Sequence, residues 1–277
     1  MNEKSYTFDV VSIGNYTKDT IVNAAGTQYA DGGGVTYSAH AAHTLGRRVA
    51  AVTRLAAEDF HAVRDLEKAG ISVFATETPS STLMRLEYPT DNPDERILTV
   101  ADTAGSFTPD EVRPFEARAF IVSPSFRGEF PIETLRELRN KDTLISVDAQ
   151  GFIRVRRPDG RLEHVDWPEQ KDVLALVDIL KTNVVEAEAM TGRSDIREAA
   201  EALAEQGFGV GVFLLDAVAT GQVPERLGQR GMIVAKLRAL GGQHVLQQSL
   251  TFRMLTVQQG ERRQVTHRGN HDRVVWF

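Results

Sequence analysis

The sequence contains no cysteine among its 277 residues. This absence excludes disulfide scaffolds, thiolate zinc sites and cysteine nucleophiles, and it fits a reducing compartment. No apolar run approaches the roughly 18 to 20 residues that a membrane-spanning helix needs. The first residues, MNEKSYTFDVVSIG, also lack the basic-then-apolar order of a secretory signal. We therefore expect a cytoplasmic protein without a membrane partner.

The sequence also lacks an excess of positive charge. Its 32 Lys and Arg residues are outnumbered by 38 Asp and Glu residues, which gives a net charge of −6. Nucleic-acid binding needs a basic patch, so no nucleic-acid partner is expected. The dinucleotide-binding, Walker A, zinc-protease and Gly-x-Ser-x-Gly signatures are all missing. His40 and His43 lie three residues apart on a predicted helix, but no carboxylate is spaced to complete a metal site with them.

What the sequence does contain is an alternation of short β-branched runs and segments with helical spacing. Such alternation predicts an α/β fold, with a mainly parallel sheet covered by helices on both faces. The capping box at Thr108 and the prolines Pro109 and Pro131 mark helix starts. Strands are expected at residues 8–13, 48–53, 71–76, 118–123, 143–148 and 177–181, and helices at 35–45, 58–69, 132–139, 184–190 and 196–206.

Three stretches interrupt this alternation. Residues 20–31 are strand-like around a glycine turn, and residues 82–102 read as two strands joined by a Pro-Thr-Asp-Asn-Pro-Asp turn. Extra strands of this kind predict a small β lid over one edge of the sheet. Residues 150–167 read as a polar hairpin that turns at Pro158-Asp159-Gly160.

Candidate binding residues follow the first strand, because open parallel sheets bind ligands beyond the carboxyl ends of their strands. Asn15 and Asp19 lie there, and Asp19 can accept hydrogen bonds from ligand hydroxyls. Gly32, Gly33 and Gly34 precede a helix, where bare backbone amides can approach a ligand closely. The ordinary alternatives are a solvated carboxylate in a turn and a flexible glycine turn.

Later strands end in a second set of candidates. Asn183 and Glu186 form a capping-box pattern, which is a sufficient structural explanation. The functional alternative places a carboxylate near a hydrated metal ion, with no direct protein ligands assigned. Asp148 and Arg154 could face a cleft after the preceding strand, although turn chemistry explains this segment equally well.

Taken in order, these segments resemble the PfkB (ribokinase-like) carbohydrate kinases over about residues 6–207. The family has a first strand followed by a Gly…Asp loop, here Gly14 to Asp19. A Gly-Gly segment then enters a small-residue helix that ends in Leu-Gly, here residues 32–46. Lys-x-Asn-x-x-Glu with a later Thr-Gly follows, here residues 181–186 and 191–192. The run VDAQGFIR at 147–154 also looks like one branch of the family.

The resemblance implies ATP-dependent phosphoryl transfer to a hydroxyl of a sugar, polyol or nucleoside. It assigns substrate hydroxyls to Asp19 and the glycine backbone, and Mg²⁺ and phosphates to Asn183 and Glu186. It also suggests a homodimer formed through the lid. Thr17 and Tyr37 replace asparagines of the family pattern, which puts the substrate's identity in doubt.

The last quarter departs from the family. Residues 208–277 carry four acidic and nine basic side chains, and eight of the twelve glutamines lie there. The Gly-Ala-Gly-Asp motif, whose Asp is the family's catalytic base, is not found. We therefore divide the chain into a core, 1–207, and an atypical tail, 208–277. A divergent replacement, a degenerate kinase and a reading-frame shift near codon 207 are the possible accounts, and the frame shift explains the most observations.

Two functions remain open on this sequence: a carbohydrate kinase with impaired activity, or a catalytically inactive protein that binds a polyhydroxylated ligand. Within the tail, residues 210–215 are expected to form a strand and 231–240 to have helical character. The end, from about Gln258, is expected to be loosely ordered because it is polar with little periodicity.

Overall fold

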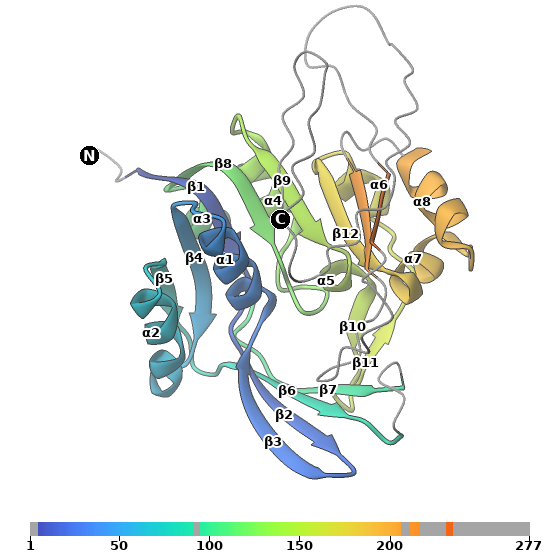
Figure 1. The fold of residues 1–277 in the computed structure, drawn as a ribbon, viewed down its shortest axis with the longest axis horizontal. Helices are drawn as coiled ribbons and strands as arrows, with labels where there is room; N and C mark the ends of the chain where they lie inside the picture. The colour runs from blue at the N-terminus through green and yellow to red at the C-terminus, as the bar shows by residue number, and fades with distance from the viewer. Residues whose placement is uncertain (1–4, 91–94, 206–210, 216–230, 235–277) are drawn as a thin grey trace, which may run out of the picture.

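An eight-stranded sheet forms the centre of the molecule, in the order β14-β13-β12-β9-β8-β1-β4-β5 (Figure 1). The computed structural model describes residues 5–90, 95–205, 211–215 and 231–234. All neighbours pair in parallel except β13 and β14. The strands are β1 (Tyr6–Ile13), β4 (Val49–Leu55), β5 (Ser72–Glu77), β8 (Phe115–Val122), β9 (Leu144–Asp148), β12 (Ile179–Asn183), β13 (Gly211–Leu215) and β14 (Gly231–Val234).

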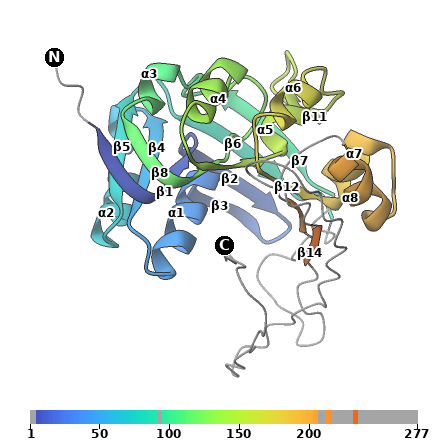
Figure 2. The same cartoon turned by 90° about the horizontal axis from the view of Figure 1, so that it is seen from above.

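Helices cover both faces of this sheet, as the sequence predicts (Figure 2). Val10 on β1 joins the core closed by α1 and α2, whereas its neighbour Val11 joins the core that contains Leu135 and Leu138 of α4. Successive side chains of a strand point to opposite faces, so an uninterrupted apolar strand serves two cores. The helices are α1 (Gly34–Thr44), α2 (Phe60–Lys68, preceded by the 3₁₀ turn Ala57–Asp59), α3 (Pro109–Val112), α4 (Ile132–Arg139), α5 (Gln150–Ile153), α6 (Gln170–Leu174), α7 (Val184–Thr191) and α8 (Ile196–Glu205).

A separate four-stranded sheet, here called the small sheet, has the order β3-β2-β6-β7. Two antiparallel hairpins build it, joined through a parallel pairing of β2 with β6. The predicted extra strands therefore form a separate sheet. However, β2 begins at Thr17 and places Asp19 inside a strand, whereas the sequence predicts a loop there. Its strands are β2 (Thr17–Asn23), β3 (Gly26–Gly32), β6 (Thr82–Glu87) and β7 (Ile97–Asp102).

The hairpin expected at residues 150–167 is confirmed only in part. β10 (Arg154–Arg156) and β11 (Leu162–His164) form it, but the four preceding residues form the short helix α5. The carbonyl of Ala149 accepts hydrogen bonds from the amides of Phe152 and Ile153, at 2.9 and 3.2 Å, and starts a helical turn. A Cβ on Gly151 would lie 2.0 Å from the Pro124 side chain, so glycine at this position lets the turn pack closely against Pro124.

Two short strands of the tail join the main sheet. β13 pairs in parallel with β12, which confirms the strand expected near residues 210–215. The helical prediction for residues 231–240 is wrong at its start, because Gly231–Val234 pairs antiparallel with β13 as β14. A free sheet edge overrides a weak local preference over four residues. The loosely ordered end expected from Gln258 lies outside the described residues.

None of the helices in the described ranges is both long and apolar enough to cross a membrane.

Candidate functional site

The main sheet has its topological switch point at β1, which has β4 on one side and β8 on the other. The start of α1 lies directly against the end of β8 here. A Cβ on Gly14 would lie 2.7 Å from the carbonyl oxygen of Ser123, and a Cβ on Gly34 would lie 2.5 Å from the Ser123 Cβ. Only glycine permits this close approach. Open α/β sheets bind their ligands in the crevice at such a point.

The predicted substrate residues come together at this switch point. Gly33 has a φ of 102°, and a Cβ there would lie 2.6 Å from the carbonyl oxygen of Asn15. A Cβ on Gly32 would lie 2.5 Å from the Asp19 carboxylate. The glycines therefore hold the start of α1 against the turn between β1 and β2. We call this set the glycine group: Asn15, Asp19, Gly32, Gly33 and Gly34.

Two side-chain oxygens of the glycine group are buried without a hydrogen-bond donor. They are Oδ1 of Asn15 and Oδ1 of Asp19. The Asn15 amide nitrogen donates to the Gly105 carbonyl and to Glu129, both at 2.9 Å, which fixes the orientation of the amide. Burial raises the pKa of Asp19, against an opposing hydrogen bond from Thr17. Unpaired buried acceptors are costly, and a ligand hydroxyl would satisfy them.

A second carboxylate of this region, Glu129, has no counterpart among the residues predicted from sequence. It is 1 % exposed and accepts hydrogen bonds from Asn15, from the Ser125 amide at 2.6 Å and from the Thr82 hydroxyl at 3.3 Å. It thereby joins the end of β1, the loop after β8 and the start of β6. The sequence offered no signal, since a glutamate in a turn before Pro131 is normally solvated.

Glu129 predicts a specific pH dependence of stability. Burial raises its pKa to about 6, against 4.5 ordinarily. Between pH 4.5 and about 6, Glu129 is protonated in the folded state and ionised in the unfolded state. The stability that Glu129 contributes by binding this proton is therefore present at low pH and is lost as the pH rises through about 6. Relative to Glu129→Gln, the wild type should gain about 2 kcal/mol in free energy of unfolding as pH falls from about 7 to about 4.5. Urea denaturation measures this difference, and parallel pH profiles would contradict it.

The second predicted set gathers at the junction of β12 and α7. Asn183 Oδ1 accepts from the Glu186 amide at 2.8 Å, and Glu186 Oε2 accepts from the Asn183 amide at 3.0 Å. The predicted capping box is therefore present. The other Glu186 oxygen pairs with Arg154 at 2.8 Å, with side chains only 3 % and 7 % exposed. Asp148 pairs with Lys181. We call this set the arginine group: Asp148, Arg154, Lys181, Asn183 and Glu186.

Arg154 has two further partners that the sequence did not suggest. Its guanidinium donates to Gln150 at 2.8 Å and to Nε2 of His164 at 3.4 Å. Burial, together with the nearby Arg154 charge, lowers the pKa of His164 to about 4, so His164 is neutral at pH 7 and can accept this bond. Burial also raises the pKa of Asp148 against the effect of Lys181.

The arginine group does not fit direct coordination of Mg²⁺. Both of its carboxylates are already paired with cations, and the described residues contain no group of three His, Asp or Glu side chains placed to hold a metal. Mg²⁺ usually keeps several waters and prefers free carboxylate oxygens. Lys181 pairs with Asp148, but its side chain is still 46 % exposed, so it can also reach a phosphate-bearing ligand.

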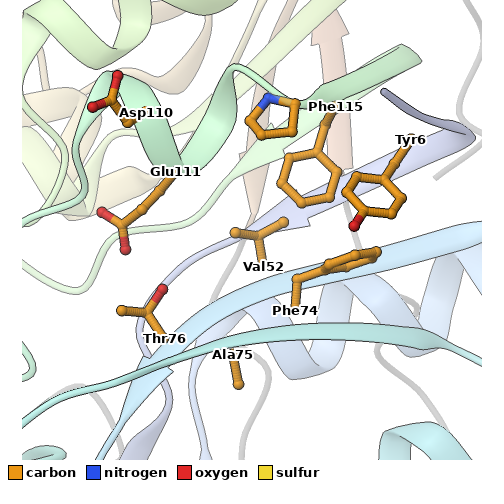
Figure 3. Close-up of a pocket in the computed structure, with 9 residues that line it drawn as sticks. Tyr6, Val52, Phe74, Ala75, Thr76, Asp110, Glu111 and Phe115 are labelled. Atoms are coloured by element: carbon orange, nitrogen blue, oxygen red, sulfur yellow. The ribbon is translucent and has the colours of Figure 1, made fainter. Parts of the chain in front are cut away.

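A cavity of about 260 Å³ lies elsewhere, lined by residues of β1, β4, β5, α3 and β8 (Figure 3). The rings of Tyr6, Phe74 and Phe115 pack against one another there, with centroids 4.8 to 5.7 Å apart. Its two carboxylates, Asp110 and Glu111, are already paired with arginines. The cavity shares no residue with either group, and its lining is that of ordinary packing.

A model of the pfkB family carbohydrate kinases matches residues 4–215, most of the chain. The protein belongs to the pfkB family. This confirms the resemblance predicted from the motifs, and the match includes β13, beyond the boundary drawn at residue 207. Comparison with curated proteins finds no match.

Solved structures of ribokinase-family kinases share this pfkB fold. A sulfate complex of a pyrophosphate-dependent kinase in the ribokinase family is 27 % identical, covers 82 % of this chain and 78 % of its own, and has a TM-score of 0.73. A pyrophosphate-dependent kinase complexed with a pyrophosphate analog and myo-inositol is also 27 % identical, with the same coverage and a TM-score of 0.70. Arabidopsis thaliana ribokinase complexed with ribose and ATP is 15 % identical, covers 76 % and 72 %, and has a TM-score of 0.55, a likeness of fold alone.

Proposed function

We propose that this pfkB-family protein binds a cyclic polyol of the inositol class and belongs to a lineage that phosphorylates one of its hydroxyls. The observation that carries the proposal is the pair of buried oxygens without donors, on Asn15 and Asp19, beside three closely packed glycines. A compound with several neighbouring hydroxyls can donate to both oxygens at once. The likeness to a kinase complexed with myo-inositol supports this choice.

The residues of the glycine group have distinct roles in this proposal. Asp19 accepts a substrate hydroxyl with its free oxygen, and Asn15 does so with an amide that Glu129 and Gly105 hold in place. The backbone of Gly32, Gly33 and Gly34 lets the substrate approach the start of α1. The small sheet carries Asp19 and covers the ligand, so that a hydroxyl and not water receives the phosphoryl group.

The phosphoryl donor is proposed to bind at the arginine group. Phosphoryl transfer depends on positioning the phosphates and on stabilising their charge, which Lys181 at this edge can assist. The family resemblance suggests ATP with Mg²⁺, whereas the two relatives at 27 % identity use pyrophosphate. We favour pyrophosphate, because these relatives are much more similar to the chain than the ATP-bound ribokinase is.

Catalysis by this exact chain is proposed to be weak. The sequence after residue 207 lacks the Gly-Ala-Gly-Asp motif that supplies the family's base, and loss of a base or of anion donors each costs orders of magnitude in rate. The alternative, a protein that binds a polyol and transfers nothing, rests on the same absence. We retain the frame shift near codon 207 as its explanation. Translation of the coding DNA in its other two frames tests this, since no Gly-Ala-Gly-Asp-like segment in either frame refutes it.

Binding of myo-inositol by titration calorimetry tests the proposed ligand. We expect Asp19→Asn to weaken the affinity about 10- to 150-fold, because a hydrogen bond to a charged acceptor contributes about 1.5–3 kcal/mol. Asp65→Asn is the matched control, since Asp65 pairs with Lys68 on α2 and both side chains are 75 % exposed. No binding by the wild type, or equal binding by the two variants, would refute the proposal.

Phosphoryl transfer is measured separately, with pyrophosphate or ATP as donor and Mg²⁺ present. We expect at most slow formation of a phosphorylated polyol. Rates typical of kinases, about 1–100 per second, would show that the missing motif does not impair this chain. Dimer formation through the small sheet is a further proposal, which sedimentation tests directly.

A further inference from the structure

The hairpin formed by β10 and β11 spans from the arginine group to the small sheet (Figure 1). At its tip, the carbonyl of Gly160 accepts a hydrogen bond from the amide of Val100 on β7, at 2.8 Å. Arg161 forms a β-bridge with Thr99. Farther back, the Arg156 guanidinium donates to the carbonyl of Ala101 at 2.6 Å. The hairpin thus touches three consecutive residues of β7.

Gly160 makes this contact possible. Its φ is 86°, in the left-handed region that favours glycine. A Cβ at this position would lie 2.8 Å from the Val100 carbonyl oxygen and 3.1 Å from Thr99. Any larger residue would therefore push the tip away from β7. Because Gly160 belongs to neither the glycine group nor the arginine group, this contact can be broken without touching a proposed ligand.

The base of the hairpin is fixed to α7 by Arg154, the first residue of β10. Its guanidinium contacts His164 at the end of β11, Gln150 on α5 and Glu186 on α7. The Val165 amide also donates to the Ile153 carbonyl, at 2.8 Å, which closes the base. Both strands of the hairpin are therefore joined to the first turn of α7 through one buried side chain.

Glu186 has no oxygen left without a partner in this arrangement. One oxygen caps α7 through the Asn183 amide, and the other pairs with Arg154. A displacement of Arg154 changes the position of a carboxylate that also fixes the first turn of α7. That turn belongs to the arginine group, where we have proposed that the phosphoryl donor binds.

We propose that the β10–β11 hairpin couples the small sheet to α7, and that Arg154 is the positioning residue that transmits this coupling to Glu186. Movement of the small sheet over a bound polyol then shifts the first turn of α7, where the phosphoryl donor is proposed to bind. The ligand-dependent part rests on the proposed function, whereas the mechanical link between β7 and α7 does not. The two parts are therefore tested by different measurements.

Hydrogen exchange on the full chain tests the link without any ligand. Gly160→Val should give several-fold faster exchange in β7 and, through Arg154, in the first turn of α7. Gly46→Val is the matched control, because Gly46 also has a positive φ, of 74°, but nothing lies within 4 Å of its added Cβ. It should change neither segment. Faster exchange in β7 with no change in α7 would overturn the proposal.

Arg154→Lys provides a second test if Gly160→Val does not fold. Lysine keeps the charge but cannot reach three partners with one planar group. Coupling between two sites is reciprocal, so this variant should loosen β7 as well as the first turn of α7. Faster exchange confined to α7 would show that Arg154 holds only its own neighbourhood, and would contradict the coupling.

Calorimetry with myo-inositol and pyrophosphate tests the functional consequence. In the wild type, the affinity for myo-inositol should differ with and without pyrophosphate, and the ratio of the two affinities is the coupling factor. In Gly160→Val this coupling factor should be close to one, while the affinity for myo-inositol alone is retained. An unchanged factor in Gly160→Val would refute the coupling. Absence of myo-inositol binding by the wild type would refute the proposed function, and hydrogen exchange would still decide the link.

Discussion

Arg154→Ala is expected to lower the free energy of unfolding by about 3–5 kcal/mol, because it leaves the buried Glu186 carboxylate without its cation. The two side chains are only 7 % and 3 % exposed, so water does not replace the lost partner. Urea denaturation followed by circular dichroism measures the loss. Arg157→Ala is the matched control, since its pair with Glu163 is about half exposed and is expected to contribute only about 0–1 kcal/mol.

A double variant separates the missing pair from the unpaired charge. Arg154→Met combined with Glu186→Gln removes both charges and keeps a side chain that can complete the capping box of α7. We expect it to recover most of the stability that Arg154→Ala loses, because a neutral replacement of a buried pair is often tolerated.

For the single variant Arg154→Ala, a loss below about 1 kcal/mol would contradict the prediction and would mean that Glu186 is solvated in solution.

Gly33→Ala is expected to abolish measurable polyol binding and to lower the free energy of unfolding by about 1–3 kcal/mol. Its φ of 102° is unfavourable for alanine, and the added Cβ would lie 2.6 Å from the Asn15 carbonyl oxygen. Relief of this overlap moves the start of α1 away from Asn15, so the two oxygens would no longer be placed to bind the proposed polyol together. Calorimetry with myo-inositol and urea denaturation give the two readouts.

Gly26→Ala is the control for Gly33→Ala. Gly26 has a φ of 131°, but an added Cβ there meets nothing within 4 Å. This variant should therefore show the cost of the backbone conformation alone, about 1 kcal/mol, with polyol affinity retained. Equal affinities for myo-inositol in the two variants would show that the contact between Gly33 and Asn15 does not shape the binding site.

The features that could be predicted from sequence are those with a local cause. The six core strands are apolar runs bounded by turns, and the capping boxes at Thr108 and Asn183 are formed by residues three apart. The glycine triplet was also informative, because three bare residues before a helix indicate a close backbone approach. Because these patterns are local, the sequence alone predicts both the fold class and the residues of the glycine group.

Features that depend on distant partners could not be predicted. Glu129 meets Asn15 across 114 positions, and Arg154 meets Glu186 across 32, with no local pattern for either contact. The sequence predicts a loop at Asp19 because the start of β2 is polar, and its partner β6 comes from much later in the chain. The helical prediction fails at β14 because a four-residue run carries little periodicity, and pairing with β13 decides its conformation.

The parallel pairing of β2 with β6 has a consequence for how the chain folds. Thr17 pairs with Thr82, and between them the chain forms β3, α1, β4, α2 and β5. β2 cannot reach its partner until this long loop has closed, and closing it becomes cheaper once β4 and β5 have aligned beside β1. During synthesis β2 and β3 therefore leave the ribosome before β6, and the edge of β2 stays unpaired until β6 has been synthesised.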